Sequence, residues 1–329
     1  MYDRATAPPR RFPVRVLSEF ALIDRYFRRP TRQTVCGVGD DGALVRPSPG
    51  CELVVSTDML VAGTHFLPEA APTDLGWKVL AVNVSDMAAM GAQPRWALLA
   101  AALPDADEAW IARFAGGFFA CAEEFGIDVI GGDTTKGPFN FCVTLFGELP
   151  AGKALLRSGA RPGDEIWVSG APGRAAQGLA HLQGQIVLEE PARTDCLAAL
   201  HRPQPRVALG LALRESGLAT AAIDISDGLL ADLGHILDAS GAAATLTLAV
   251  APESTFADNC YLSGGDDYEL LFTAPAARHE EALTLSRNLG LPLTCIGIVE
   301  AGPPGRFAVL TPDGAPVTIE RRGYDHFAP

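Results

Sequence analysis

The segment Ala221-Ala-Ile-Asp-Ile-Ser-Asp-Gly-Leu-Leu-Ala-Asp-Leu-Gly-His-Ile-Leu-Asp-Ala-Ser240 decides the fold class of this chain. Its first five residues are mostly apolar and predict a short buried strand over 221–225. A helix predicted over 228–240 begins directly after the tight turn that ends the strand. A strand that runs straight into a helix is typical of a mixed α/β fold, and the same alternation continues through both halves of the sequence.

Outward from this segment, apolar runs and helical spacing predict the other main elements. Ser18 and Glu19 open a helix whose apolar residues lie three and four positions apart. Thr73 is the predicted cap of a long helix that ends near Met90, with Asp74 in its first turn. The remaining predicted strands and helices are, in chain order, 52–56, 96–103, 107–125, 127–130, 140–149, 164–169, 268–273, 276–289 and 293–299.

At 329 residues the chain is long enough for two lobes, each with its own core. We expect a flexible tail over 1–16, an N-terminal α/β domain over 17–150 and a C-terminal α/β domain over 151–329. The stretch 152–163 then connects the two domains. The predicted fold class is therefore α/β, of the α+β kind, with two mixed lobes.

The charge balance argues against several kinds of partner. Lys plus Arg number 26 and Asp plus Glu number 39, so the net charge is −13, and the only lysines are Lys78, Lys136 and Lys153. A nucleic-acid groove or an anionic membrane surface needs a clustered positive field, which this composition does not provide. We therefore expect neither nucleic acid nor membrane among the partners.

Cysteine usage and the terminal sequence indicate the compartment. The seven cysteines are an odd number without a Cys-x-x-Cys pair, which fits free thiols in a reducing environment. The N-terminus lacks the apolar stretch of a secretory signal, and the apolar run 96–103 is too short to span a bilayer. The predicted location is the cytoplasm.

Nine aspartates fall in six short segments rich in Gly, Ser or Thr, each at the end of an apolar run. The segments are Gly37-Val-Gly-Asp-Asp-Gly42, Ser56-Thr-Asp58, Asn83-Val-Ser-Asp86, Gly131-Gly-Asp-Thr-Thr135, Asp224-Ile-Ser-Asp227 and Gly264-Gly-Asp-Asp-Tyr-Glu269. Two carboxylates about 4 Å apart repel by about 4 kcal/mol at an effective dielectric of about 20, so such clusters need water, protons or cations. Mg²⁺ prefers hard oxygen ligands, and bridging by magnesium is the interpretation we favour.

The first two segments each have a structural alternative. The Gly-x-Gly-x-x-Gly match at 37–42 fits a dinucleotide fingerprint only formally, because Asp40 and Asp41 would repel a pyrophosphate. A solvated Asp-Gly turn is the alternative to a metal site there. The segment 56–58 ends an apolar strand at a sheet edge, where ligands bind, or else it caps a turn.

Asp86 and Asp133 also have two interpretations each. Asp86 lies in an apolar helical segment, so its carboxylate needs either a metal ion or a salt bridge to Lys78 or Arg95, the nearest cations in the sequence. The glycines before Asp133 would let the backbone approach a ligand whose phosphates reach the carboxylate through metal. An ordinary β-turn over 131–135 is the alternative.

The remaining candidates lie in the C-terminal half or outside the clusters. Ser226 or Asp227 would cap the helix that follows, or a nucleotide phosphate would lie near Ser226 at the helix N-terminus. The polar run 264–269 is either a wet loop or part of a site. Arg157 is a candidate for bidentate phosphate contact or an ordinary surface arginine, and His65 for substrate contact or a packing residue.

Several common phosphate-binding and catalytic motifs are missing from the sequence. It has no Gly-x-x-x-x-Gly-Lys-Ser/Thr loop, no kinase-type His-Arg-Asp triplet, no Gly-x-Ser-x-Gly elbow and no His/Cys metal spacing. Because lysines are scarce, the charge of a transferring phosphoryl group would have to be neutralised by several Mg²⁺ ions that the aspartates hold.

Taken together, the motifs resemble those of the thiamine-monophosphate kinases, in the superfamily of aminoimidazole-ribonucleotide synthetase and selenophosphate synthetase. The matching segments cover almost the whole chain in order, at 18–23, 39–41, 56–58, 62–66, 82–86, 131–135, 224–228, 264–268 and 323–327. The resemblance implies two mixed α/β lobes of the aminoimidazole-ribonucleotide synthetase-like type, an N-terminal lobe that binds ATP and magnesium, and a homodimer paired through that lobe. It also implies phosphorylation of thiamine monophosphate by ATP to thiamine diphosphate and ADP, the last step of thiamine diphosphate biosynthesis. Transfer would be direct and in line, without a phosphoenzyme.

The resemblance further implies roles for matching positions, with Mg²⁺ as cofactor and ATP as co-substrate. The implied Mg²⁺ ligands are Asp41, Ser56, Thr57, Asp58, Asp86, Asp133, Asp224 and Asp227. The implied ATP contacts are Gly132, Asp133, Arg157 and Ser226, and the implied contacts to the thiamine side are His65, Asp266 and Tyr324. Where the family usually has Gly-Gly-Glu-Asp, this chain has Gly-Gly-Asp266-Asp267, so the shorter side chain would reach its ligand through water.

Two other functions fit the same residues. One is another ATP-using synthetase of the superfamily, acting for example on a formamidine or on selenide. Selenide chemistry would need a reactive N-terminal Cys or selenocysteine in a glycine-rich loop, and no cysteine precedes Cys36. The other is a protein that binds nucleotide or thiamine phosphate without catalysis.

Overall fold

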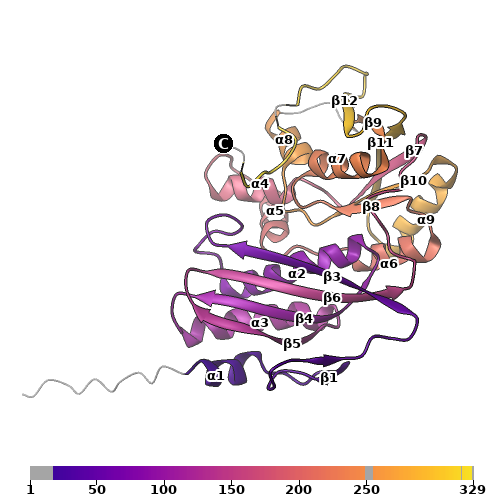
Figure 1. Ribbon diagram of the computed structural model, residues 1–329. Coiled ribbons are helices and arrows are strands. Elements are labelled where there is room, and N and C mark those ends of the chain that lie inside the picture. The colour runs from indigo at the N-terminus through magenta and orange to yellow at the C-terminus, as the bar shows by residue number, and fades with distance from the viewer. Residues whose placement is uncertain (1–17, 249–254, 320, 328–329) are drawn as a thin grey trace, which may run out of the picture.

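The computed structural model describes residues 18–248, 255–319 and 321–327, which form two lobes (Figure 1). Each lobe is a β-sheet with helices packed on it. The mixed α/β fold class predicted from the sequence is therefore confirmed. The tail expected over 1–16 lies outside the described residues.

The N-terminal lobe is built on a four-stranded sheet in the order β3-β6-β4-β5. β4 and β5 are parallel, and the other neighbours are antiparallel. Helices α2 and α3 lie on one face of this sheet (Figure 1). The elements of the lobe are α1 (Glu19–Leu22), the π-helical turn η1 (Ile23–Phe27), β1 (Thr34–Cys36), β2 (Leu44–Val45), β3 (Cys51–Val61), α2 (Pro72–Ala89), β4 (Gln93–Leu103), α3 (Glu108–Glu124), β5 (Asp128–Lys136) and β6 (Asn140–Pro150).

The C-terminal lobe contains a six-stranded sheet in the order β12-β9-β11-β7-β10-β8. Its strands are antiparallel except for the pair β12 and β9. The elements are β7 (Asp164–Ser169), α4 (Arg174–Leu182), α5 (Ala192–His201), α6 (Val207–Ser216), β8 (Ala221–Asp224), α7 (Leu229–Ser240), β9 (Ala243–Thr247), α8 (Thr255–Ser263), β10 (Leu270–Pro275), the 3₁₀ turn η2 (Ala276–Arg278), α9 (His279–Leu289), β11 (Leu293–Glu300) and β12 (Arg306–Leu310). Among the described residues, no helix combines the length and the apolar character that crossing a membrane requires.

Helix α2 joins the two lobes because it is apolar on nearly all sides. Fourteen of its 18 residues are buried, and a helix that is apolar all round must be covered all round. It packs on β3, β6 and α3 of its own lobe and on α6 and β8 of the other. At Gly210 of α6, a Cβ would lie 2.0 Å from the Ala88 carbonyl oxygen, so only glycine lets the two helix backbones approach this closely.

The first helix opens at Ser18 as predicted, and the helix predicted over 107–125 begins with a cap at Asp107. Ser18 accepts a hydrogen bond from the amide of Ala21 at 3.4 Å, and Asp107 caps α3 by accepting from the amide of Ala109 at 2.9 Å. The cap predicted at Thr73 is wrong. Helix α2 begins one residue earlier, at a proline, whose fixed φ suits the first helical position and whose missing N–H needs no partner there.

Two strands are longer than the sequence predicted. β3 pairs with β6 along its entire length, so Ser56, Thr57 and Asp58 lie in the middle of an edge strand and not at its end. β5 runs on in parallel register with β4 through 131–136, which excludes the β-turn considered for 131–135. Pairing with a neighbouring strand extends both elements across residues that a local pattern assigns to loops.

Candidate active site between the lobes

A cavity of about 830 Å³ lies between the lobes, and both lobes line it. The N-terminal lobe contributes β3, the loop that follows it and α2, and the C-terminal lobe contributes α4, α5, the loops beside β8 and β10, and the C-terminal segment. Eight of the predicted site residues line the cavity: Asp58, His65, Asp86, Asp224, Ser226, Asp227, Asp266 and Tyr324.

Part of the cavity wall is a cluster of three carboxylates, Asp58, Asp86 and Asp224, from three different elements. Strand alternation turns Ser56 and Asp58 toward α2, where the Ser56 hydroxyl donates a short hydrogen bond to Asp86. Asp224 ends β8 in the other lobe, and the Ser85 hydroxyl of α2 donates to its Oδ2 at 2.6 Å. The cluster therefore exists only because the lobes meet.

Burial perturbs the protonation of all three carboxyls. Burial, followed by the charges of Asp86 and Asp224, raises the pKa of Asp58 to about 7. Burial and the charge of Asp86 raise the pKa of Asp224 to about 7, and burial raises that of Asp86 as well. The positive charge of Arg157 acts in the opposite direction on Asp86 and Asp224, so this predicted phosphate ligand lies within electrostatic reach of the cluster.

The donor set of the cluster fits Mg²⁺. Carboxylate and hydroxyl oxygens are the hard ligands that this ion prefers, and the raised pKa values show that positive charge would be favoured here. Within the described ranges, no three His, Cys, Asp or Glu side chains already surround one point closely enough to hold an ion. Such a site would be completed by water or phosphate oxygens, which Mg²⁺ commonly keeps among its ligands.

The salt bridge considered for Asp86 is wrong. Lys78 pairs instead with Asp266 of the C-terminal lobe, and Arg95 pairs with Glu148 at 3.0 Å. Asn83 of α2 contacts the neighbouring strand instead, where its Oδ1 accepts from the backbone amide of Asp58 at 3.1 Å.

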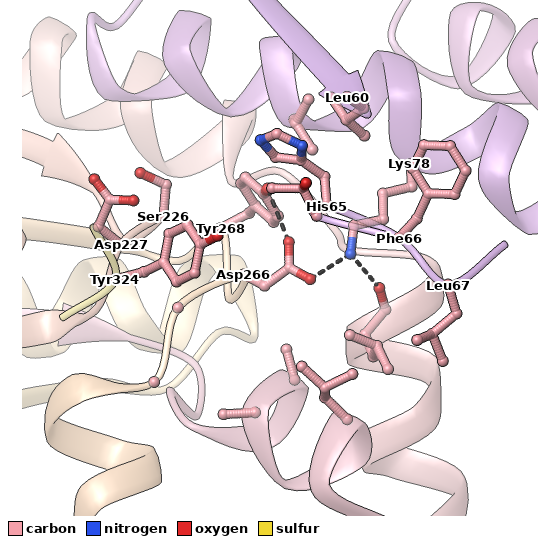
Figure 2. A pocket seen from close by; sticks show the side chains of 18 of the residues that line it. Leu60, His65, Phe66, Leu67, Lys78, Ser226, Asp227, Asp266, Tyr268 and Tyr324 are labelled. Carbon is pink, nitrogen blue, oxygen red and sulfur yellow. Dashed lines mark hydrogen bonds and ion pairs between the residues drawn. The ribbon is translucent and has the colours of Figure 1, made fainter. Parts of the chain in front are cut away.

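Aromatic side chains also line the cavity, among them His65, Tyr268 and Tyr324 (Figure 2). His65 and Tyr324 lie on either side of His326, with ring centroids 4.9 Å and 4.8 Å from that of His326. Burial lowers the pKa of His65, and the neighbouring His326 lowers it further, so His65 is neutral at pH 7. Its Nδ1 accepts from the Val61 amide at 3.0 Å, and the amide of Tyr324 donates to the Asp227 carbonyl at 2.8 Å, which holds the C-terminal segment against the cavity.

Comparison with known proteins agrees with this two-lobed arrangement. The family model "AIR synthase related protein, N-terminal domain" matches residues 39–149, and the corresponding C-terminal domain model matches residues 161–309. Thiamine-monophosphate kinase of Escherichia coli K12 is 46% identical over 323 residues, covering 94% of this chain and 98% of the relative. The crystal structure of thiamine-monophosphate kinase from Stenotrophomonas maltophilia K279a has a TM-score of 0.79 at 45% identity and covers 92% of this chain and 98% of the neighbour.

The chain belongs to the thiamine-monophosphate kinase family. It is therefore an enzyme of the kinase class, and its lobes are of the aminoimidazole-ribonucleotide synthetase-like type. A further structure, AaThiL complexed with AMPPCP and TMP, has a TM-score of 0.72 at 32% identity and covers 98% of this chain and 100% of its own.

In this kinase family member, some predicted site residues lie away from the carboxylate cluster. Asp41 is exposed in the turn 37–42 and does not line the cavity. Thr57 points to the other face of β3, where its hydroxyl donates to the Val143 carbonyl at 2.9 Å and lies 3.0 Å from the Thr144 hydroxyl. Their roles as metal ligands stay predictions.

Asp133 and Asp58 lie on opposite faces of the N-terminal sheet. One row of residues paired across the strands consists of Met59, Cys142, Ala100 and Asp133. Side chains in one row share a face, so Asp133 points the same way as exposed Met59, and Asp58 points the other way. The structure of one chain therefore does not bring these two carboxylates together. Gly132 has no room for a side chain, since a Cβ there would lie 1.8 Å from the Leu99 carbonyl oxygen.

The helix cap predicted at Ser226 or Asp227 is wrong. Gly228 occupies the cap position, and the buried carboxylate of Asp232, one turn inside α7, folds back over the helix N-terminus. Its Oδ2 accepts from the amides of Ser226, Asp227 and Gly228 at 3.0, 3.2 and 3.2 Å. These amides already have a carboxyl oxygen as acceptor, so a phosphate near Ser226 would have to be bound by side chains.

The segment 264–269 is not a wet loop. Asp267 is buried and accepts from the Gly173 amide at 2.7 Å at the start of α4. Buried Glu269 pairs with Arg206 at 2.6 Å and accepts from the Ser169 hydroxyl at 2.6 Å.

Sequence reasoning considered Lys78 only as a partner of Asp86 and assigned no role to Asp232. Lys78 carried a usable signal, because a lysine between Trp77 and Val79 in an apolar helix must be buried and must find a partner. Asp232 carried little signal, because an acidic residue in the first turn of a helix is common and does not reveal which amides it will reach.

Proposed function

We propose that this chain phosphorylates thiamine monophosphate with ATP, giving thiamine diphosphate and ADP as the last step of thiamine diphosphate biosynthesis. The observation that carries the proposal is the cavity between the lobes, which both carboxylates and aromatic rings line. A substrate that joins a phosphate to a flat organic ring system matches both kinds of lining residue. AaThiL, a structural relative, is known in complex with AMPPCP and TMP.

The carboxylate cluster would hold the phosphates through Mg²⁺. Its proposed ligands in the cavity are Asp58, Asp86, Asp224 and Asp227, with Ser56 beside them. When bound, the cations neutralise phosphate charge so that two anionic reactants can approach each other. The chain itself then has mainly positioning work, which fits direct in-line transfer without a covalent phosphoenzyme.

Other residues orient the reactants. Arg157 lies within electrostatic reach of the carboxylates and would contact a phosphate of ATP, together with the Ser226 side chain. His65 and Tyr324 would lie against the thiamine rings. Asp266 would accept a hydrogen bond from the thiamine moiety.

We further propose that two copies pair through the open face of the N-terminal sheet. The side chains of Leu53, Val55 and Met59 on this face are 41%, 56% and 52% exposed, which is a large apolar surface on one edge strand. Asp133 lies on the same face, so its proposed contacts, and those of Gly132 and Asp41, would be made near the junction of the two copies. The cytoplasm stays the predicted location.

The direct test is product formation by the purified chain. Thiamine monophosphate, ATP and Mg²⁺ should give thiamine diphosphate and ADP in equal amounts, as measured by chromatography. ADP release without thiamine diphosphate would favour another synthetase of the superfamily. Binding of both ligands without product would favour a non-catalytic binding protein.

Replacing one cluster carboxylate should separate the metal role from a structural role. Asp58→Asn keeps the shape of the side chain and removes one negative charge, so we expect kcat to fall on the order of a hundredfold while the fold is retained. Isothermal titration calorimetry with Mg²⁺ and an ATP analogue should show weaker cation binding, which is a readout independent of turnover.

Asp195→Asn is the matched control for this variant. Asp195 is an exposed aspartate on α5 whose pairing with Arg174 spans 3.9 Å, so its loss should leave both readouts unchanged. Full activity of Asp58→Asn would remove this carboxylate from the proposed metal site.

A further inference from the structure

Lys78 is a buried ammonium group in the middle of helix α2. Its residue is only 4% exposed, and lysine is almost never buried to this degree unless its charge has partners. A buried charge that lost those partners would be strongly destabilising. The partners that the chain provides therefore indicate what the lysine does.

Both polar contacts of the ammonium cross from the N-terminal lobe to the C-terminal lobe (Figure 2). Its Nζ donates to the Leu200 carbonyl oxygen of α5 at 2.9 Å and forms a close ion pair with Asp266 Oδ2. The other oxygen of Asp266 accepts from the Tyr268 hydroxyl at 2.9 Å. The carboxylate is thus fixed at both of its oxygens.

In the ion pair of Lys78 and Asp266, the lysine is the more buried partner and the aspartate is the more exposed one. The side chain of Lys78 is 6% exposed and that of Asp266 is 29% exposed, and both line the cavity. A carboxylate has about four lone-pair sites, and the bonds from Lys78 and Tyr268 occupy two of them. Asp266 therefore keeps acceptor capacity for a ligand, while the lysine holds it from the buried side.

The backbone around Asp266 is strained, which makes the support from Lys78 relevant. Asp266 and Tyr268 have φ angles of 73° and 54°, in the left-handed region that residues other than glycine rarely adopt. The Asp266 amide donates to the Ser226 carbonyl and the Tyr268 amide to the Ile225 carbonyl, both at 2.8 Å. These bonds tie the loop to its own lobe, and the ion pair ties it to the other.

We propose that Lys78 is a positioning residue for the substrate, which fixes the Asp266 carboxylate in the cavity wall and joins the two lobes beside the bound molecule. The inference rests on the proposed function. Thiamine monophosphate offers a cationic ring and a ring-bound amino group, and either is a suitable partner for the acceptor sites that Asp266 keeps. Lys78 acts on the substrate through Asp266 and takes no part in the transfer itself.

Steady-state kinetics of Lys78→Met, Asp266→Asn and the double variant test the proposal. Loss of the ammonium should raise KM for thiamine monophosphate roughly tenfold or more, because the carboxylate is no longer held in place. KM for ATP should change less than about twofold, since Asp266, which Lys78 holds, is a proposed contact of the thiamine moiety and not of ATP. The two changes should not be additive, because both remove the same arrangement.

Matched variants make the result specific. Lys153→Met removes an exposed lysine in the stretch that connects the two lobes and should leave every constant unchanged. Lys78→Gln keeps hydrogen-bond donors at the same position without the charge, and it serves if the methionine variant does not fold. We expect Lys78→Gln to raise KM for thiamine monophosphate less than Lys78→Met does.

Three results would overturn the assignment. If Lys78 variants melt at a lower temperature but keep the wild-type KM for thiamine monophosphate, the lysine is merely structural. Additive effects of Lys78→Met and Asp266→Asn would show that the two residues act separately. A wild-type chain that forms no thiamine diphosphate would overturn the proposed function and this assignment with it, whereas an active wild type with unaffected variants overturns the assignment alone.

Discussion

At the scale of single residues, the carboxylate cluster makes the stability of the metal-free protein fall as the pH rises from acidic to neutral. Asp58 and Asp224 ionise at about 7 in the folded chain, against 3.8 for an unperturbed aspartate. At pH values between these two pKa values, the two carboxyls stay protonated in the folded state but are ionised in the unfolded state. The free energy of unfolding therefore falls as the pH rises from about 4 to about 7, and the full penalty remains above that.

Magnesium should offset this penalty where it is largest. We expect Mg²⁺ to raise the melting temperature more at about pH 8 than at about pH 5.5, because the cluster binds a cation best when it is ionised. Differential scanning fluorimetry with EDTA and with excess Mg²⁺ at both pH values measures the difference. An equal shift at the two pH values would mean that the cation binds elsewhere, and Asp58→Asn should reduce the pH dependence.

At the scale of secondary-structure elements, the start of helix α7 depends on one buried side chain. Asp232 accepts three amide hydrogen bonds there, and burial, followed by the charges of Asp224 and Asp227, raises its pKa to about 8. At pH 7 it is therefore mostly protonated, with one acceptor oxygen and one donor, as in asparagine. The loop that presents Ser226 to the cavity is held by this contact.

Two replacements of Asp232 should therefore differ in their effect on stability. Asp232→Leu leaves the amides buried without a partner and should lower the free energy of unfolding by about 2 kcal/mol or more. Asp232→Asn retains an acceptor and should cost less than about 1 kcal/mol. Urea denaturation at pH 7 measures both, and equal losses in the two variants would show that packing, not the amide contacts, gives the residue its importance.

The elements could largely be predicted from the sequence, whereas the interactions between them could not. Helical spacing and apolar runs are local, so α3 and β6 appear close to their predicted bounds. The true extent of β3 depends on its pairing with β6, which no local pattern contains. The pair Lys78–Asp266 joins residues 188 positions apart, and only the meeting of the lobes creates it.

At the scale of the whole molecule, the open face of the N-terminal sheet predicts self-association. Val55→Glu places a charge in the middle of the exposed apolar row and should weaken the proposed dimer roughly tenfold or more, because the desolvated carboxylate would have no partner. Sedimentation velocity over a concentration series measures the change. Val187, 86% exposed in the C-terminal lobe, offers the control substitution Val187→Glu, which should leave the dimer intact.

Helix α2 also limits how this enzyme can evolve. The two lobes enclose this helix along its length. Three of its side chains have polar roles: Asp86 belongs to the carboxylate cluster, Ser85 donates to Asp224, and Lys78 pairs with Asp266. A substitution almost anywhere along it must satisfy a packing neighbour and a polar partner at once. Neutral drift in this lineage should therefore accumulate on outer helices such as α9, whose only buried residue is Ala282, while α2 changes slowly.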